Sequence, residues 1–189
     1  MTDVYRRLTD HIDEFWPRNR KARVTWPVGP IHLSLPNFSV LRIAPRSEKE
    51  PWVYLTVGAW EADAGQGYRS EFFLVSPWED RRNVETLSML AHHHAGPEHR
   101  IELGSSIKIG RPWLDGSRLD HLLISLPYPY GPKLEFCTLG KELQVRYLWV
   151  LPITRSEHQF RCRAGLEALE QQLEAAGINY LDPDRDSAI

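Results

Sequence analysis

The sequence has few cysteines, no long apolar run and little net charge, and each shortage excludes a class of protein. Two cysteines, Cys137 and Cys162, are too few for a disulfide framework. No apolar run approaches the roughly 18–20 residues of a membrane-spanning helix, and the charged N-terminus does not resemble a signal peptide. A net charge of −2 gives no electrostatic case for nucleic acid or an anionic membrane. We therefore expect a cytoplasmic protein without nucleic-acid or membrane partners.

Tryptophan, in contrast, is abundant, with seven residues in a chain of 189. Such a number indicates a large aromatic core, an aromatic binding face, or both. The hydrophobic content of 42% and charged content of 25% are ordinary for a globular protein. Because no linker, repeat or low-complexity block interrupts the chain, we expect a single domain over residues 1–189.

The most strongly patterned stretch begins with a predicted strand. Residues Leu143 to Leu151 alternate in hydrophobicity, and the second face also becomes apolar toward the end. A strand that is apolar on both faces is typical of the middle of a sheet. Pro152 cannot donate a ladder hydrogen bond, so we expect the strand to end there.

A helix is predicted directly after this strand. Thr154 and Glu157 have the spacing of a capping box, in which each side chain bonds the other residue's backbone amide. The apolar stripe that follows predicts one long helix, with Cys162 on its buried side and Gly177 at its end. The acidic residues beyond Gly177 are expected to form a loose, solvated tail.

Several other elements are predicted more briefly. An N-terminal helix is expected over residues 4–15, and a second capping box, Ser76 with Glu79, predicts a helix that ends before Gly96. Strand candidates are residues 23–28, 31–35, 39–44, 51–60, 70–75, 121–126 and 136–138, of which 51–60 and 70–75 form a hairpin pair. This pattern favours an α+β fold, with a mixed, mostly antiparallel sheet and about three main helices.

The run His92-His93-His94 is the first candidate for chemistry. Consecutive helical residues point about 100° apart, so the three rings are not expected to converge on one ion. The i, i+4 spacing of a helical metal pair is absent, and His94 lies on the apolar stripe. Cys137 follows Phe136 at a strand position and is interpreted as a small core residue. We expect no catalytic residues, no metal and no cofactor.

Aromatic residues at strand ends and in loops are the better candidates for function. Tyrosine and tryptophan beside arginine are typical of a protein-binding patch. The alternative is that these rings close over the core at the rim of the sheet. We predict that the partner-binding residues are Trp60, Glu61, Tyr68, Trp113, Tyr128 and Tyr130.

Strings in a fixed order then carry a family resemblance. WVYLTVGAW, EFFLVSP, LSMLAHHH, PWLDGSRLDHLLISLPYPYGP and LWVLPITRSEHQF, followed by LEALEQQLEAAGINYLDPDR, span about Pro51 to Arg185. Together they resemble the suppressor-of-fused-like domain family. The resemblance implies an α+β domain without known catalysis, and it supplies no catalytic residues. It also implies that animal members hold a transcription factor's peptide between two domains, whereas compact bacterial members act as immunity proteins.

The leading hypothesis is a cytoplasmic, non-catalytic protein-binding module, of the immunity type, that occludes a cognate toxin domain or peptide. One alternative is a hydrolase or transferase that uses Cys137 and His121, or a histidine-bound metal. Another is a structural subunit of an oligomer whose aromatic residues lie at the self-interface.

Overall fold

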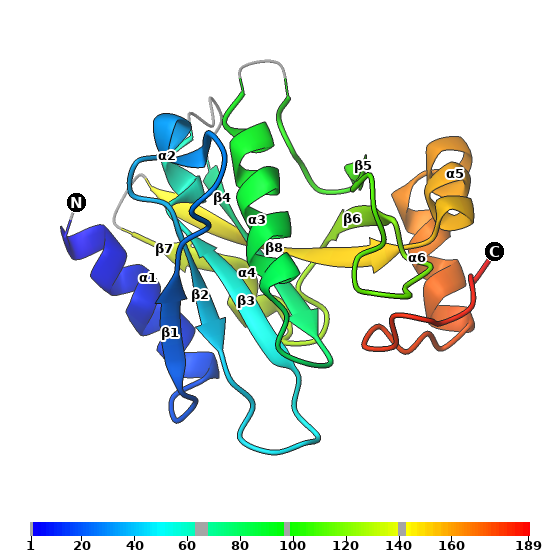
Figure 1. Cartoon of the computed structure of the whole chain (residues 1–189), viewed down its shortest axis with the longest axis horizontal. Helices are drawn as coiled ribbons and strands as arrows, with labels where there is room; N and C mark the ends of the chain where they lie inside the picture. Colours follow the sequence, from blue (N-terminus) through cyan, green and yellow to red (C-terminus); the bar gives the residue numbers. More distant parts are fainter. Residues whose placement is uncertain (1, 63–67, 97–98, 140–142) are drawn as a thin grey trace. The chain divides into compact units, whose positions relative to one another are not determined.

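The computed structural model describes residues 2–62, 68–96, 99–139 and 143–189 of the chain (Figure 1). The chain divides into two compact units. The first unit comprises Met1–Ile101 and Leu126–Trp149, and the second comprises Glu102–Ser125 and Val150–Ile189. Each unit therefore combines two separate stretches of chain, and the two are described in turn.

The first unit is built on a mixed sheet. Its strands are β1 (Lys21–Val24), β2 (Ser39–Ile43), β3 (Trp52–Val57), β4 (Tyr68–Ser76), β7 (Phe136–Thr138) and the beginning of β8 (Gln144–Ile153). The order is β1-β2-β3-β4-β8, and β7 also pairs with β8. The β4–β8 pair is parallel, while β1–β2, β2–β3, β3–β4 and β7–β8 are antiparallel. These pairings confirm the predicted mixed, mostly antiparallel sheet and the hairpin of residues 51–60 with 70–75.

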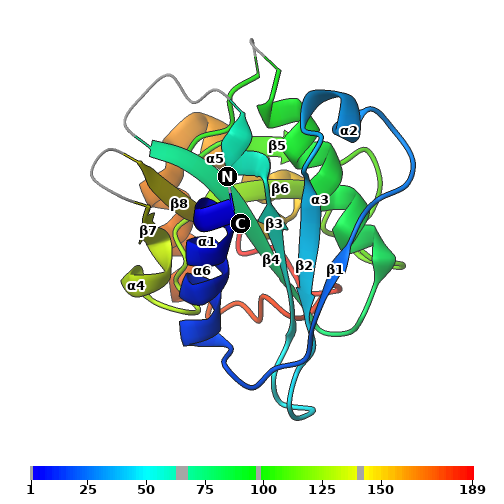
Figure 2. The same cartoon turned by 90° about the vertical axis from the view of Figure 1, so that its left-hand side faces the viewer.

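Helices cover both faces of this sheet. They are α1 (Thr2–Phe15), α2 (Ile31–Ser34), α3 (Arg81–His94) and α4 (Pro132–Glu135), with a 3-10 turn η1 (Ala59–Glu61) after β3. Neighbouring residues of β4 show the two faces, because Phe72 contacts His94 of α3, whereas Phe73 contacts Tyr130, which in turn contacts Trp16 after α1. Figure 2 accordingly shows α1 and α3 on opposite sides of β3 and β4. The alternation of one strand thus builds two apolar layers.

Two predictions for the first unit are wrong. Residues Ile31–Ser34 form the short helix α2 instead of a strand. Helix α3 is capped by Asp80, whose carboxylate accepts the Arg82 N–H at 2.8 Å, and not by Ser76. Ser76 ends β4 opposite Trp52, so the ladder holds it in an extended conformation four residues before the cap. The pairing of the hairpin therefore overrides the local capping signal.

The second unit contains a small antiparallel pair and two helices. Its elements are β5 (Ser106–Lys108), β6 (His121–Ser125), the last residues of β8, α5 (Arg155–Ala164) and α6 (Leu166–Ala175). The predicted capping box is confirmed, because Thr154 Oγ accepts the Glu157 N–H at 3.3 Å and Glu157 Oε2 accepts the Thr154 N–H at 2.8 Å. Strand β8 nevertheless continues through Pro152 to Ile153, which corrects the expected end.

The long helix predicted after Thr154 is in fact two helices. Gly165, with φ 93°, separates α5 from α6 because a residue in this left-handed region cannot continue a right-handed helix. The apolar stripe is buried on α6 at Leu169 and Leu173, whereas Cys162 on α5 is exposed. The predicted burial of Cys162 is therefore wrong. No helix among the described residues is both long enough and apolar enough to cross a membrane.

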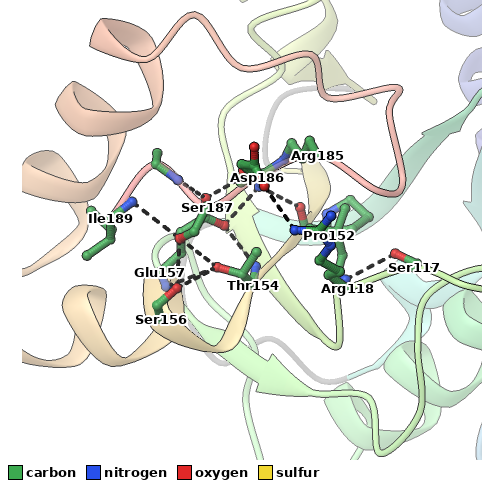
Figure 3. A network of polar contacts seen from close by, with 12 residues as sticks. Ser117, Arg118, Pro152, Thr154, Ser156, Glu157, Arg185, Asp186, Ser187 and Ile189 are labelled. Carbon is green, nitrogen blue, oxygen red and sulfur yellow. Dashed lines mark hydrogen bonds and ion pairs between the residues drawn. The ribbon is translucent and has the colours of Figure 1, made fainter.

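The C-terminal segment is docked instead of forming the solvated tail that was predicted (Figure 3). Arg185 is buried and makes two hydrogen bonds to the buried Glu157, Nη1 to Oε1 at 2.6 Å and Nη2 to Oε2 at 2.8 Å. Burial alone would raise the pKa of Glu157, but the hydrogen bonds from Arg185 and from the Ala188 and Thr154 amides hold it below its ordinary value. The segment is thus fixed by a bidentate ion pair to the first turn of α5.

Candidate functional site

Two of the predicted partner-binding residues, Trp60 and Glu61, lie in the η1 turn. Gly58 precedes this turn with φ 109°, and a Cβ atom there would lie 3.1 Å from Phe38 Cα. Such an approach is tighter than most Cβ contacts, and side chains rarely adopt this positive φ, so glycine is favoured where the chain turns out of β3. The turn therefore presents Trp60 and Glu61 at a position set by backbone sterics.

A buried carboxyl group on β4 holds the same turn from within. Glu71 is fully buried, and its Oε1 accepts the Gly58 N–H at 2.8 Å and the Trp60 N–H at 3.4 Å. Thr56 donates its hydroxyl to the other oxygen, Oε2. Burial raises the pKa of Glu71 to about 7, although these hydrogen bonds act in the opposite direction. The carboxyl group thus satisfies amides that the turn would otherwise leave unpaired.

The side chains around Trp60 and Glu61 form a cluster that we call the Trp60 corner, consisting of Tyr5, Trp60, Glu61 and Arg69. Tyr5 donates its hydroxyl to Glu61 Oε1 at 2.6 Å, and its ring meets Trp60 edge-on with centroids 6.0 Å apart. The Arg69 guanidinium lies over the Trp60 ring at 5.5 Å. The ring of Trp60 is 7% exposed and Glu61 is half-buried, so the carboxylate is the more accessible group.

Tyr128 and Tyr130 lie in a different part of the first unit, in the turn after Pro127. The Pro127 carbonyl accepts the Tyr130 N–H at 2.9 Å. The ring of Tyr130 packs against Trp16 and Phe73, with centroids 4.7 and 5.8 Å away. Tyr128, in contrast, is 58% exposed. Tyr130 therefore anchors the turn to the core, and Tyr128 is the aromatic ring that a partner can reach.

The remaining two predicted residues are placed differently. Trp113, in the second unit, is 0% exposed, and its backbone N–H donates to the Leu119 carbonyl at 2.7 Å. This burial favours the alternative in which the ring completes the core. Tyr68 begins β4 opposite Gln144, and its side chain lies outside the described part of the structure. The structure thus brings Trp60 and Glu61 together and places Trp113 away from solvent.

The catalytic alternative rested on Cys137 and His121. Cys137 is buried in the first unit, with its sulfur 3.8 Å from the Arg7 carbonyl, and burial raises the pKa of its thiol to about 11. A thiol with so high a pKa is a poor nucleophile at neutral pH. His121 lies in the second unit, where Nδ1 is 2.6 Å from Asp120 Oδ1.

His121 belongs to a polar cluster that was not predicted to form a site. Its ring stacks on His158 of α5 with centroids 4.3 Å apart. His158 Nδ1 is 2.9 Å from the Ser106 hydroxyl, and Nε2 is 3.8 Å from the exposed sulfur of Cys162. Burial and the neighbouring His121 lower the pKa of His158. The i, i+4 spacing of His158 and Cys162 indicated that the two side chains are neighbours, but Cys162 was expected on the buried side of the helix and was therefore not chosen as a candidate.

The histidine run diverges, as predicted. His94 is buried, accepts the Ile101 N–H on Nδ1 at 3.2 Å, and has its pKa lowered to about 4 by burial. His92 Nδ1 is 3.0 Å from the Ser34 hydroxyl, and His93 stacks on His99 with centroids 4.6 Å apart. Within the described ranges, no three His, Cys, Asp or Glu side chains are arranged to hold a metal ion.

Comparison with known proteins identifies the family. The model of the suppressor of fused protein family (SUFU) matches residues 34–186, which is most of the chain. The chain belongs to the SUFU family. A crystal structure of a SUFU homologue from Neisseria gonorrhoeae is 39% identical, with a TM-score of 0.88 over 100% of this chain and 98% of that one. No curated protein sequence matches the chain.

Two more distant structures share the SUFU fold. A chain in the Sufu–Fu complex is 13% identical with a TM-score of 0.73, over 98% of this chain and 92% of that chain. Drosophila Suppressor of Fused is also 13% identical with a TM-score of 0.74, and the match covers 51% of its length. This SUFU chain therefore corresponds to about half of the Drosophila protein, and at such low identity the likeness concerns the fold alone.

Proposed function

We propose that this SUFU-family chain is a non-catalytic protein-binding module that neutralises a cognate toxin domain in the cytoplasm by occluding it. Membership of the SUFU family carries the proposal, because a solved member of this fold is described in a complex with another protein, Fu. An occluding protein needs a rigid surface more than it needs reactive groups. The Trp60 corner, fixed from beneath by Glu71, supplies such a surface.

Within this proposal, Tyr128 and Glu61 make the principal contacts. Tyr128 offers an exposed ring on a turn that Tyr130 anchors, and an anchored tyrosine loses little conformational entropy on binding. Glu61 offers a carboxylate already oriented by Tyr5. Trp60, Tyr68 and Tyr130 support these contacts, and Trp113 contributes through the stability of the second unit.

Two observations support the absence of catalysis. The thiol of Cys137 is buried with a raised pKa, and His94 is a buried histidine that accepts a backbone amide. Both have the partners expected of core residues. Neither has the exposed, activated environment of a nucleophile or a general base.

The proposal is tested by purifying the tagged protein from its native host and identifying the protein retained with it. The identified partner, cloned and purified, is then titrated against wild type, Tyr128→Ala and Glu61→Ala by calorimetry. We expect Tyr128→Ala to weaken binding by about tenfold or more, the range of a contact residue at an interface centre. Leu33→Ala is the matched control, since Leu33 is 87% exposed and lies on α2.

The toxin assignment has its own test. Expression of the partner in a cell without this chain is expected to arrest growth, and co-expression of wild type is expected to restore it. A harmless partner would refute the immunity function, whereas unchanged affinity in both alanine variants would refute only the proposed surface.

A second candidate is a thiol-dependent transferase or hydrolase that uses Cys162 and His158. The observation favouring it is the 3.8 Å approach of Cys162 to His158, whose other nitrogen is 2.9 Å from Ser106. Burst kinetics with a p-nitrophenyl ester, abolished in Cys162→Ser but retained in Cys137→Ser, would support this candidate over the first.

A further inference from the structure

Strand β1 forms an open edge of the sheet in the first unit. Among the described strands it pairs with β2 and with no other (Figure 1). The register sets Lys21 opposite Ile43, and one step earlier the Ala44 N–H donates to the Arg20 carbonyl at 2.9 Å. The outer side of β1 is therefore a row of backbone groups available for pairing with a further strand.

The register shows which amides face outward. In an antiparallel ladder, hydrogen-bonded and non-hydrogen-bonded pairs alternate along the strand. Because Arg20 and Ala44 form a hydrogen-bonded pair, Ala22 and then Val24 also point their backbone groups toward β2. The backbone N–H and C=O groups of Lys21 and Arg23 consequently point to the outside of the sheet.

The same edge carries a local concentration of positive charge. Residues 15–47 contain no aspartate or glutamate, although the whole chain has a net charge of −2. Arg18, Arg20 and Arg23 are exposed, and none of the three makes an ion pair within the described part of the chain. Lys21, in contrast, bends back to Asp13, 2.6 Å away.

Charged residues on an edge strand can also serve to prevent self-association, and lysine is the residue most used for this purpose. Here the one lysine, Lys21, turns toward α1 and donates to the Trp16 carbonyl. The other basic side chains at this edge are arginines, whose planar guanidinium groups bind carboxylates through paired hydrogen bonds. This distribution favours a binding role over a protective one.

We propose that the outer edge of β1 binds an extended, acidic segment of a partner protein by strand addition. The amide and carbonyl groups of Lys21 and Arg23 pair with the added backbone, and Arg18, Arg20 and Arg23 pair with its carboxylates. This inference rests on the proposed function as a protein-binding module, and it adds a contact on the edge strand to those proposed at the Trp60 corner.

The test uses a synthetic probe, so that its outcome does not depend on finding a toxin. A fluorescein-labelled peptide of about six to eight residues, alternating glutamate and threonine, is long enough to cover a strand of this size. Its binding is followed by fluorescence anisotropy at low and at physiological salt. A peptide of the same sequence with every backbone amide N-methylated is the control, because it keeps the charge and loses the backbone donors on both of its edges.

Two substitutions at one position separate backbone pairing from charge. Arg23→Ala and Arg23→Pro remove the same charge, but only proline removes the outward N–H, and proline is tolerated on edge strands. We expect Arg23→Pro to bind the peptide roughly fivefold more weakly than Arg23→Ala, the effect of one hydrogen bond. Combined Arg18→Glu and Arg20→Glu is expected to weaken binding about tenfold, with a loss of salt dependence.

Hydrogen exchange gives an independent readout. Peptide binding is expected to slow exchange of the Lys21 and Arg23 amides, whereas those of Ala22 and Val24 already pair with β2 and change little. Strand addition would be overturned by any one of three results. The N-methylated peptide binds as tightly as the unmodified one, the two Arg23 variants have equal affinity, or the acidic peptide does not bind. Self-association of the Arg18→Glu, Arg20→Glu variant without peptide binding by wild type would assign the arginines a protective role instead. Failure of toxin rescue would leave these results unaffected.

Discussion

Replacing Glu71 by glutamine is expected to remove a pH dependence of stability that this buried carboxyl group gives to the protein. The pKa of Glu71 is raised from 4.5 to about 7 in the fold by burial. In the unfolded chain the group loses its proton near the lower value. Between the two values the unfolded state is ionised while the folded state keeps its proton, so the free energy of unfolding falls as the pH rises.

The size of the effect follows from the two pKa values. A rise from 4.5 to about 7 corresponds to about 3 kcal/mol of unfolding free energy at 1.36 kcal/mol per pKa unit. This contribution is fully present below pH 4.5 and is lost as the pH rises through about 7. Glutamine stays neutral, can accept the Gly58 amide through its oxygen, and can donate to Thr56 through its nitrogen. The Glu71→Gln variant should therefore lack this decline.

Urea denaturation of both proteins between about pH 5 and pH 8 measures the difference. The wild-type curve minus the variant curve isolates Glu71, because all other titrating groups are shared. Glu71→Ala is the companion variant, since it leaves the Gly58 amide unpaired and should be less stable at every pH. A difference curve that stays flat across this range would refute the raised pKa and with it the account of the turn.

Three further predictions concern other buried or exposed groups. His94, with a pKa lowered to about 4, stays neutral in the fold while the unfolded histidine protonates below 6.5. The free energy of unfolding therefore falls by about 3 kcal/mol as the pH falls through this window. His94→Gln should not show this loss when urea denaturation is measured at acidic pH. Arg185→Met leaves Glu157 buried without its countercharge and is expected to lower the free energy of unfolding by roughly 3–5 kcal/mol. Chemical denaturation measures this loss. Adding Glu157→Gln to the same variant should restore stability, and no recovery would contradict the explanation by an unpaired charge. Cys162 is exposed and Cys137 is buried, so a thiol reagent should modify one cysteine in the native protein and the second only after unfolding. Rapid modification of native Cys162→Ser, in which Cys137 is the remaining thiol, would contradict the structure.

The elements that were predicted correctly are those in which local and tertiary signals agree. Thr154 and Glu157 form their capping box because β8 ends beside them, so local hydrogen bonding and tertiary placement favour the same helix start. The alternation of residues 51–60 and 70–75 likewise matches a hairpin whose faces are both covered. The family resemblance was confirmed by the match over residues 34–186.

The wrong predictions arise where one local signal has two readings. The short stretch Ile31–Ser34 lies between prolines and is too brief for its period to separate strand from helix. Gly165 was passed over because a single glycine is tolerated inside a helix, and only its φ of 93° shows the break. Arg185 was read as part of a solvated tail because its partner Glu157 is 28 residues away.

The candidate site was predictable only in part for the same reason. The sequence does not show whether a tyrosine or tryptophan in a predicted loop will be exposed or buried. Trp113 and Tyr128 therefore could not be told apart before the core was known. The outward direction of the Lys21 and Arg23 amides depends on the strand register, which no local pattern specifies.

The division of the chain affects how the protein can fold during synthesis. The first unit needs β8, which enters the sheet parallel to β4 with Tyr68 opposite Gln144, so its central pairing waits for residues that emerge much later. Parallel pairing at such sequence separation is slow because loop closure precedes any gain in contacts. A nascent chain that ends near Ile101 would hold β4 as a bare sheet edge, and chaperones that shield such edges should associate with the ribosome-bound protein at this stage.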